Sequence, residues 1–273
     1  MNEIMYDKNS FEIALVLLVS MALMIELGYR LARQARRDNS ESLLSHTGSV
    51  QAALLGLLAL LLGFTYSQSL SRYEQRSEAV VSEANAIGTT WLRAHLLPIS
   101  VREAVLQDLR RYQDLRVEAG GVSLVERSAR AALLQDSQTV VNRLWESALQ
   151  AAKDEPSPIT TGLFIQSLNE MIDSFGSREA ALNRHVPEVV LFLLYGTLLI
   201  TACVLGFTAG LAGHRASFVT YLMVGLIVII VFIIIDLDRP RRGLIEVSQK
   251  SMLDLQATIA AERDGAVDAA PPN

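Results

Sequence analysis

Hydrophobic residues gather in four long runs, arranged as two pairs near the ends of the chain with a polar block between them. Each run supplies about 18 or more residues, and at about 1.5 Å rise per residue such a helix matches a hydrocarbon core of ~30 Å. The pattern therefore predicts a polytopic membrane protein with four transmembrane helices in two hairpins. The runs cover residues 11–31, 50–70, 186–212 and 218–235.

The polar block between the two pairs has apolar residues at spacings of three and four, which is typical of one helix face. No stretch alternates with a period of two for long enough to predict a strand, so the expected fold class is all-α. No Pro or Gly lies between Gly63 and Gly88, so the second span is expected to continue into the block as one helix. Ser100 with Glu103 and Ser123 with Glu126 fit capping boxes at helix starts. The apolar stripes are Val101, Val105, Leu109, Tyr112 and Leu115, then Phe164, Leu168, Met171 and Phe175.

These patterns divide the chain into four parts. A first transmembrane hairpin (1–70) is followed by a helical soluble block (71–185), a second transmembrane hairpin (186–236) and a C-terminal segment (237–273). The end of that last segment is rich in small residues and proline, so a disordered tail is expected from residue 262.

Composition agrees with a membrane protein and argues against enzyme chemistry. The chain is 51% hydrophobic and only 19% charged, and its net charge of −5 provides no basic patch for nucleic acid. The single cysteine, Cys203, excludes an internal disulfide. No phosphate loop or nucleophile motif is present, so we expect no catalytic residue, no cofactor and no metal site. The four histidines are scattered without metal-ligand spacing: His46, His95, His185 and His214.

Small residues recur every three or four positions along the second span. Such a stripe lets helices approach closely in lipid, so helix packing is the favoured interpretation. The alternative is that part of this face lines a central axis. Gly206 and Gly210 in the third span have the same two interpretations. The stripe consists of Gly48, Ala52, Gly56, Ala59, Gly63 and Ser67.

Several motifs resemble the bestrophins. Leu-Gly-Phe at 62–64, followed after seven residues by Arg72 and Tyr73, is similar to the bestrophin second span. The helix at 109–115, Leu-Arg-Arg-Tyr-Gln-Asp-Leu, is also similar to a bestrophin helix. Glu-Ala-Asn-Ala-Ile-Gly-Thr at 83–89 and Asp-Leu-Asp-Arg-Pro at 236–240 resemble the bacterial bestrophin-like domain family. The resemblance spans residues from about 48 to 255.

This resemblance implies a pentameric ion channel whose second span lines the pore. The three neck positions of bestrophins fall on Gly56, Leu60 and Phe64 of this chain. Five copies of Leu60 and Phe64 would form an apolar constriction able to gate by dewetting. The outermost position departs from the family pattern because it is a glycine, Gly56. The neck would therefore be wider and shorter than the usual apolar collar. The alternative is that Leu60 and Phe64 face lipid or a neighbouring helix.

Charged residues near the spans are open to different interpretations. Animal bestrophins have a run of acidic residues after the last span that suits Ca²⁺. This chain has only two, followed by arginines, so an interfacial charge cluster with ion pairing is favoured over calcium binding. Glu26 and Arg30 have the i,i+4 spacing of an ion pair, whereas Glu83 and Asn85 fit either a channel vestibule or a buried hydrogen bond. The charge cluster consists of Asp236, Asp238, Arg239, Arg241 and Arg242.

Two functional hypotheses follow. The first is a homo-oligomeric, pentameric channel in the bilayer that passes small monovalent ions, with the ion left open. The alternative is a membrane-anchored interaction or sensory protein whose helical block binds a partner. Basic residues beside the spans number eight on the side of the N-terminus and the helical block and five on the side of the two hairpin loops. Because cytoplasmic flanks carry more positive charge, this count favours a cytoplasmic N-terminus and a cytoplasmic block at the cell (inner) membrane.

Overall fold

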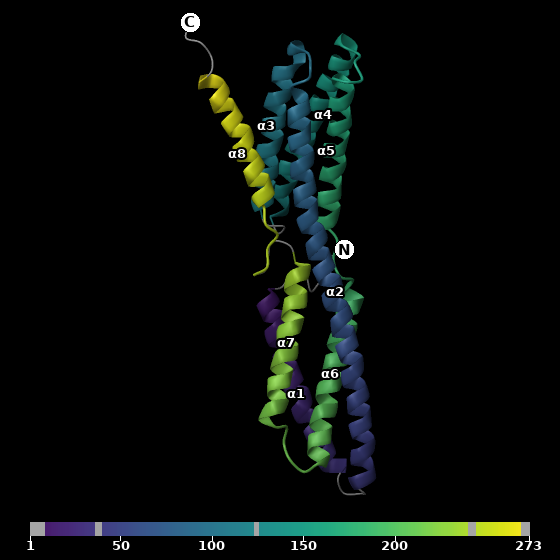
Figure 1. Cartoon of the computed structure of the whole chain (residues 1–273). Helices are drawn as coiled ribbons and strands as arrows, with labels where there is room; N and C mark the ends of the chain where they lie inside the picture. Colours follow the sequence, from purple (N-terminus) through teal and green to yellow (C-terminus); the bar gives the residue numbers. More distant parts are fainter. Residues whose placement is uncertain (1–8, 36–39, 123–125, 240–243, 269–273) are drawn as a thin grey trace. The chain divides into compact units, whose positions relative to one another are not determined.

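The structure is a computed structural model and describes residues 9–35, 40–122, 126–239 and 244–268 (Figure 1). Over these ranges the chain is helical and contains no strand, which confirms the all-α fold class. Four helices are long and apolar enough to cross a membrane: α1, α2, α6 and α7. The helices are α1 (Ser10–Ala35), α2 (Ser40–Ala94), α3 (Ile99–Gly121), α4 (Arg127–Asp154), α5 (Thr161–Leu182), α6 (Glu188–Leu211), α7 (Phe218–Asp238) and α8 (Lys250–Asp268).

The chain forms two compact units. The first contains α1, α6, α7 and α2 up to Tyr73; the second contains α3, α4, α5, α8 and the rest of α2. Helix α2 runs unbroken for 55 residues, as the absence of Pro and Gly between Gly63 and Gly88 predicts.

Close backbone contact between α1 and α6 organises the first unit. A Cβ at Gly206 would lie 1.9 Å from the carbonyl oxygen of Ile25, and one at Gly28 would lie 2.0 Å from that of Cys203. Only glycine permits such an approach, so Gly206 serves helix packing. The hydroxyls of Ser20 and Tyr195, 2.8 Å apart, join the same two helices.

The turn between α6 and α7 is short and well defined. Gly213 has a φ of 86°, in the left-handed region that glycine adopts without steric cost. The Ser217 hydroxyl then accepts a hydrogen bond from the Thr220 backbone N–H and caps the start of α7. This geometry makes α6 and α7 a tight hairpin.

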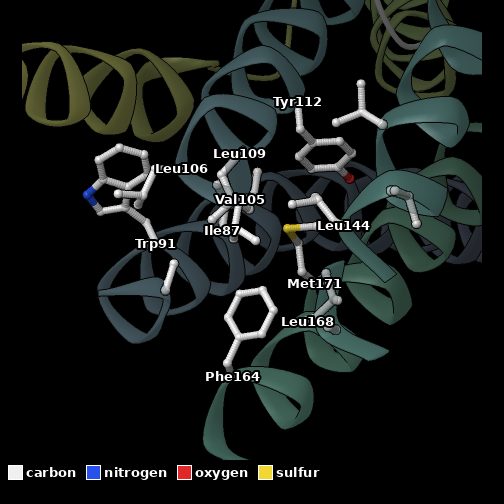
Figure 2. Close-up of a cluster of buried hydrophobic side chains, with 14 of the residues drawn as sticks. Ile87, Trp91, Val105, Leu106, Leu109, Tyr112, Leu144, Phe164, Leu168 and Met171 are labelled. Atoms are coloured by element: carbon white, nitrogen blue, oxygen red, sulfur yellow. The ribbon is translucent and has the colours of Figure 1, made fainter. Parts of the chain in front are cut away.

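The second unit packs its helices around an apolar core (Figure 2). Both stripes expected from the sequence point into it, apart from Phe175, which is half-buried. Polar contacts add to this packing, because the Thr90 hydroxyl donates to the Ser167 carbonyl of α5 at 2.9 Å. The core side chains drawn and labelled are Ile87, Trp91, Val105, Leu106, Leu109, Tyr112, Leu144, Phe164, Leu168 and Met171.

Two local expectations need correction. The capping box at Ser100 is wrong, because α3 begins at Ile99 after Pro98 and has no side-chain cap. Helix α8 continues to Asp268, so the tail expected to be disordered from residue 262 is helical over much of its length, and 269–273 lie outside the described residues. The second capping box also falls partly outside them, at Ser123.

Candidate functional site

The membrane part of α2 has one covered face and one uncovered face. Leu58, Leu62 and Thr65 are buried within the first unit. On the other side, Leu60 and Phe64 are 55% and 63% exposed, although both are large apolar side chains. The chain therefore leaves the predicted neck positions without a partner of its own.

The glycines in the membrane part of α2 behave differently from Gly28 of α1 and from Gly206 and Gly210 of α6. A Cβ added at Gly48, Gly56 or Gly63 would meet no atom within 4 Å. The small-residue stripe of the second span is therefore not used for packing within this chain. If these glycines serve close helix contact, the partner helix must come from another molecule.

Further along α2 the uncovered face becomes polar. Residues seven apart return to nearly the same side of a helix, and Phe64 is followed at this spacing by Ser71, Glu78 and Asn85, all exposed. Glu74 is exposed one turn before Glu78. A shallow pocket of about 390 Å³ lies on this face beside Glu78 and Asn85. Sequence reasoning missed both glutamates, although each lies fourteen residues, or two repeats of seven, after a neck position, and this spacing could have identified them.

Glu83 lies on the opposite, buried side of α2 and is fully excluded from solvent. Arg116 Nε of α3 donates to its Oε1 at 2.6 Å, and Arg178 Nη1 of α5 donates to its Oε2 at 2.5 Å. The Tyr112 hydroxyl also donates to Oε1, at 3.3 Å. Of the two interpretations given for Glu83, the buried hydrogen bond is therefore the correct one, and only Asn85 is on the exposed face.

The charge around Glu83 has consequences for its neighbours. Burial, reinforced by the negative charge of Glu83, raises the pKa of Tyr112 far above its ordinary value, so the phenol remains neutral and donates a hydrogen bond. Arg116 also donates to Glu179, which pairs with Arg130. The network joins α2, α3, α4 and α5 and fixes their relative positions within the second unit.

Arg76 on α2 is another buried arginine that the sequence did not reveal. Its guanidinium donates to the carbonyl oxygens of Ala181, at 3.3 Å, and Arg184, at 2.7 Å. These carbonyls lie at the C-terminal end of α5, where a helix carries unsatisfied acceptors and partial negative charge. Arg76 thus caps α5.

The predicted charge cluster at the end of α7 is bound largely through backbone groups. Both carboxylate oxygens of Asp238 accept from the Val186 N–H, at 3.1 and 3.0 Å, and Asp236 Oδ2 accepts from the Ile245 N–H at 2.9 Å. Arg239 Nη1 donates to the Ser10 hydroxyl at 3.3 Å. Arg241 and Arg242 lie outside the described residues.

Other predicted features have plain outcomes. Arg30 Nε donates to Glu26 Oε1 at 2.8 Å, which confirms that ion pair. Over the ranges that the structure describes, no three His, Cys, Asp or Glu side chains gather in a way that could hold a metal ion. Asp238 and the Oδ2 atom of Asp236 accept hydrogen bonds from neighbouring backbone, whereas Oδ1 of Asp236 is buried and has no hydrogen-bond partner among the described residues.

Comparisons with known proteins agree with this architecture. A crystal structure of a bacterial bestrophin homologue from Klebsiella pneumoniae is 17% identical, with a TM-score of 0.63, over 92% of this chain and 97% of that one. A single-substitution variant of that homologue has a TM-score of 0.62 at 16% identity, covering 94% and 99% of the two chains. A crystal structure described only as a membrane protein has a TM-score of 0.65 at 16% identity, covering 92% and 97%. No curated protein is similar in sequence to this chain.

The family assignment rests on a sequence match that is separate from these structures. The model of the Bestrophin-like domain matches residues 14–252, which include α2, α6, α7, all but the first turn of α1 and most of the second unit. The chain is therefore a multi-pass membrane protein and belongs to the Bestrophin-like domain family.

Proposed function

We propose that the protein is an ion channel in which several copies of the chain surround a pore lined by α2. The observation that carries this proposal is the uncovered face of α2 in its membrane part, where Leu60 and Phe64 are exposed and Gly56 has no neighbour. A bundle that needed only to anchor the protein has no need of a glycine-lined face on its longest helix. A ring of α2 helices would use that face.

In this assembly Leu60 and Phe64 form the narrow part of the pore, and Gly56 widens its outer end. An apolar constriction of this kind conducts when wetted and closes when it dries. Five copies is the number implied by family membership, and small monovalent ions are the expected permeant species.

The polar continuation of the α2 face supports a preference for cations. Glu74 and Glu78 are exposed, and no hydrogen bond or ion pair within the described chain occupies their carboxylates. Rings of carboxylates attract cations and repel anions near a pore. We assign the charge preference of the channel to these two positions.

The proposed location is the cell (inner) membrane, with the helical block (71–185) in the cytoplasm. Eight basic residues lie close to the spans on the side of the block, against five on the opposite side, which supports this orientation. Asn85 and Glu78 would then face a cytoplasmic vestibule.

Stoichiometry separates this proposal from a membrane-anchored interaction protein. Native mass spectrometry of the full chain in mild detergent is expected to give five copies. Planar-bilayer recording of the same sample is then expected to show ion currents. A monomer or dimer without current would contradict the proposal, because one or two α2 helices cannot enclose a pore.

A further inference from the structure

A pocket of about 440 Å³ lies between α3 and α8 in the second unit, away from the α2 face described above. This volume falls within the range of about 300–1,000 Å³ typical of small-molecule sites. One wall is polar and comes mainly from α3, and the other is largely apolar and comes from α8. The residues that matter for its chemistry are Arg110, Gln113, Asp114, Leu253, Gln256 and Ile259.

Gln113 gives the polar wall an unfilled acceptor. The residue is only 1% exposed, and its Nε2 donates to the Met252 carbonyl of α8 at 2.7 Å. Its Oε1 has no hydrogen-bond partner among the described residues, and neither has Nε of Arg110 one turn earlier. Buried polar atoms are nearly always paired, so these two unfilled groups give the wall unused hydrogen-bonding capacity.

The same wall carries one positive and one negative charge. Arg110 and Asp114 are four residues apart on α3, which places them on one side of the helix. Gln256 Nε2 of α8 donates to Asp114 Oδ1 at 2.7 Å and orients that carboxylate. Opposite them, Leu253 and Ile259 provide apolar surface.

We propose that this pocket binds a small zwitterion with an apolar side chain, of the class of the aliphatic α-amino acids. The ligand carboxylate pairs with Arg110, and its ammonium group pairs with Asp114 and the free acceptor of Gln113. The aliphatic side chain contacts Leu253 and Ile259. A ligand with only one charge would make only one of these two charged contacts, so it should bind more weakly than the zwitterion.

Binding in this pocket would connect α8 more firmly to α3. Helix α8 buries Met252 and Ile259 in the apolar core and packs Leu255 against it, and several of its other contacts are polar. A ligand held by both helices adds contacts that exist only when α8 is docked. It therefore stabilises the docked position of the C-terminal helix.

Trp91 provides a reporter beside the pocket. The Arg110 guanidinium lies over its ring, 5.1 Å from the centroid, and the indole N–H donates to Glu262 of α8 at 2.6 Å. A ligand that draws Arg110 into the pocket changes the environment of this indole. Because the chain has two tryptophans, a Trp145→Phe background leaves Trp91 as the sole source of indole fluorescence.

The test titrates the full-length protein in detergent with L-leucine and follows Trp91 fluorescence and Tm. A saturable fluorescence change and a raised Tm are expected. The two single-charge analogues, 3-methylbutylamine and 4-methylpentanoate, should bind about tenfold more weakly or worse. Arg110→Gln should abolish the response, and Arg111→Gln, a matched change at an exposed neighbouring arginine, should retain it.

Three results would overturn the inference. The first is the absence of a saturable response to any aliphatic α-amino acid up to about 10 mM. The second is a response to the amine or the acid alone that equals the response to L-leucine. The third is an undiminished response in the Arg110→Gln protein. None of these results depends on whether the protein conducts ions, so the pocket and the channel proposal can fail separately.

Discussion

Glu83 Oε1 lies 2.6 Å from Arg116 Nε, and both side chains are excluded from solvent. Because Arg178 pairs with the other oxygen of the same carboxylate, one buried glutamate pairs with two buried arginines from different helices. The pair thus connects two segments that resemble bestrophins, the stretch from Glu83 on α2 and the helix that contains Arg116.

Removing the Glu83 charge should destabilise the second unit strongly. Glu83→Gln leaves Arg116 and Arg178 buried without their shared counter-charge, which typically costs about 3–5 kcal/mol. Denaturant unfolding of the purified protein measures the change. Asp108→Asn is the matched control, because its partner Arg143 is largely exposed and such pairs contribute only about 0–1 kcal/mol. Equal losses in the two variants would contradict a structural role for the network.

The contact between α1 and α6 predicts a difference between two glycines of one helix. Gly206→Ala places a methyl group against the Ile25 carbonyl and should cost about 1–3 kcal/mol by overpacking. Gly196→Ala, also on α6, meets no atom within 4 Å and should leave Tm unchanged or slightly higher. Thermal unfolding in detergent distinguishes them, and a Tm for Gly206→Ala at or above wild type would refute the close approach.

Exposed carboxylates on α2 should set the charge preference of the proposed channel. Glu78→Gln, alone or with Glu74→Gln, should reduce the preference for cations and move the reversal potential in a salt gradient toward the anion limit. Glu118→Gln neutralises an exposed carboxylate on α3 and should leave the reversal potential unchanged. Identical reversal potentials in all variants, with currents present, would remove Glu74 and Glu78 from the selectivity mechanism while leaving the channel intact.

Much of the fold could be predicted from hydrophobic periodicity. Four long apolar runs gave four membrane-length helices, and the stripe from Val101 to Leu115 is buried because a helix presents every third or fourth residue on one face. Periodicity says little about where helices end. Helix α3 therefore begins at Ile99, after Pro98, without the expected Ser100 cap, and α8 continues through residues that looked disordered by composition.

Long-range polar contacts were beyond sequence reasoning. Glu83 and Arg178 are 95 residues apart, and nothing in their local patterns indicates that they meet. No local pattern marks Arg76, yet it caps α5 through Ala181 and Arg184. Such contacts depend on which helix faces are brought together, which a single sequence does not specify.

The neck assignment at Gly56, Leu60 and Phe64 stays a prediction that follows from family resemblance. The uncovered face of α2 is compatible with it, but the same exposure suits contact with lipid. Substitution at these positions changes unitary conductance if they line the pore and leaves it unchanged if they face lipid.

Single-channel recording of Phe64→Ala in planar bilayers measures this difference. If Phe64 lines the narrow part of the pore, removing its phenyl group from every subunit widens the constriction and lets water fill it. The unitary conductance should therefore rise severalfold. Phe192→Ala removes a comparably exposed ring from α6 and should leave conductance unchanged. Unaltered conductance in Phe64→Ala and Leu60→Ala, or the absence of any current from the wild-type protein, would contradict the account.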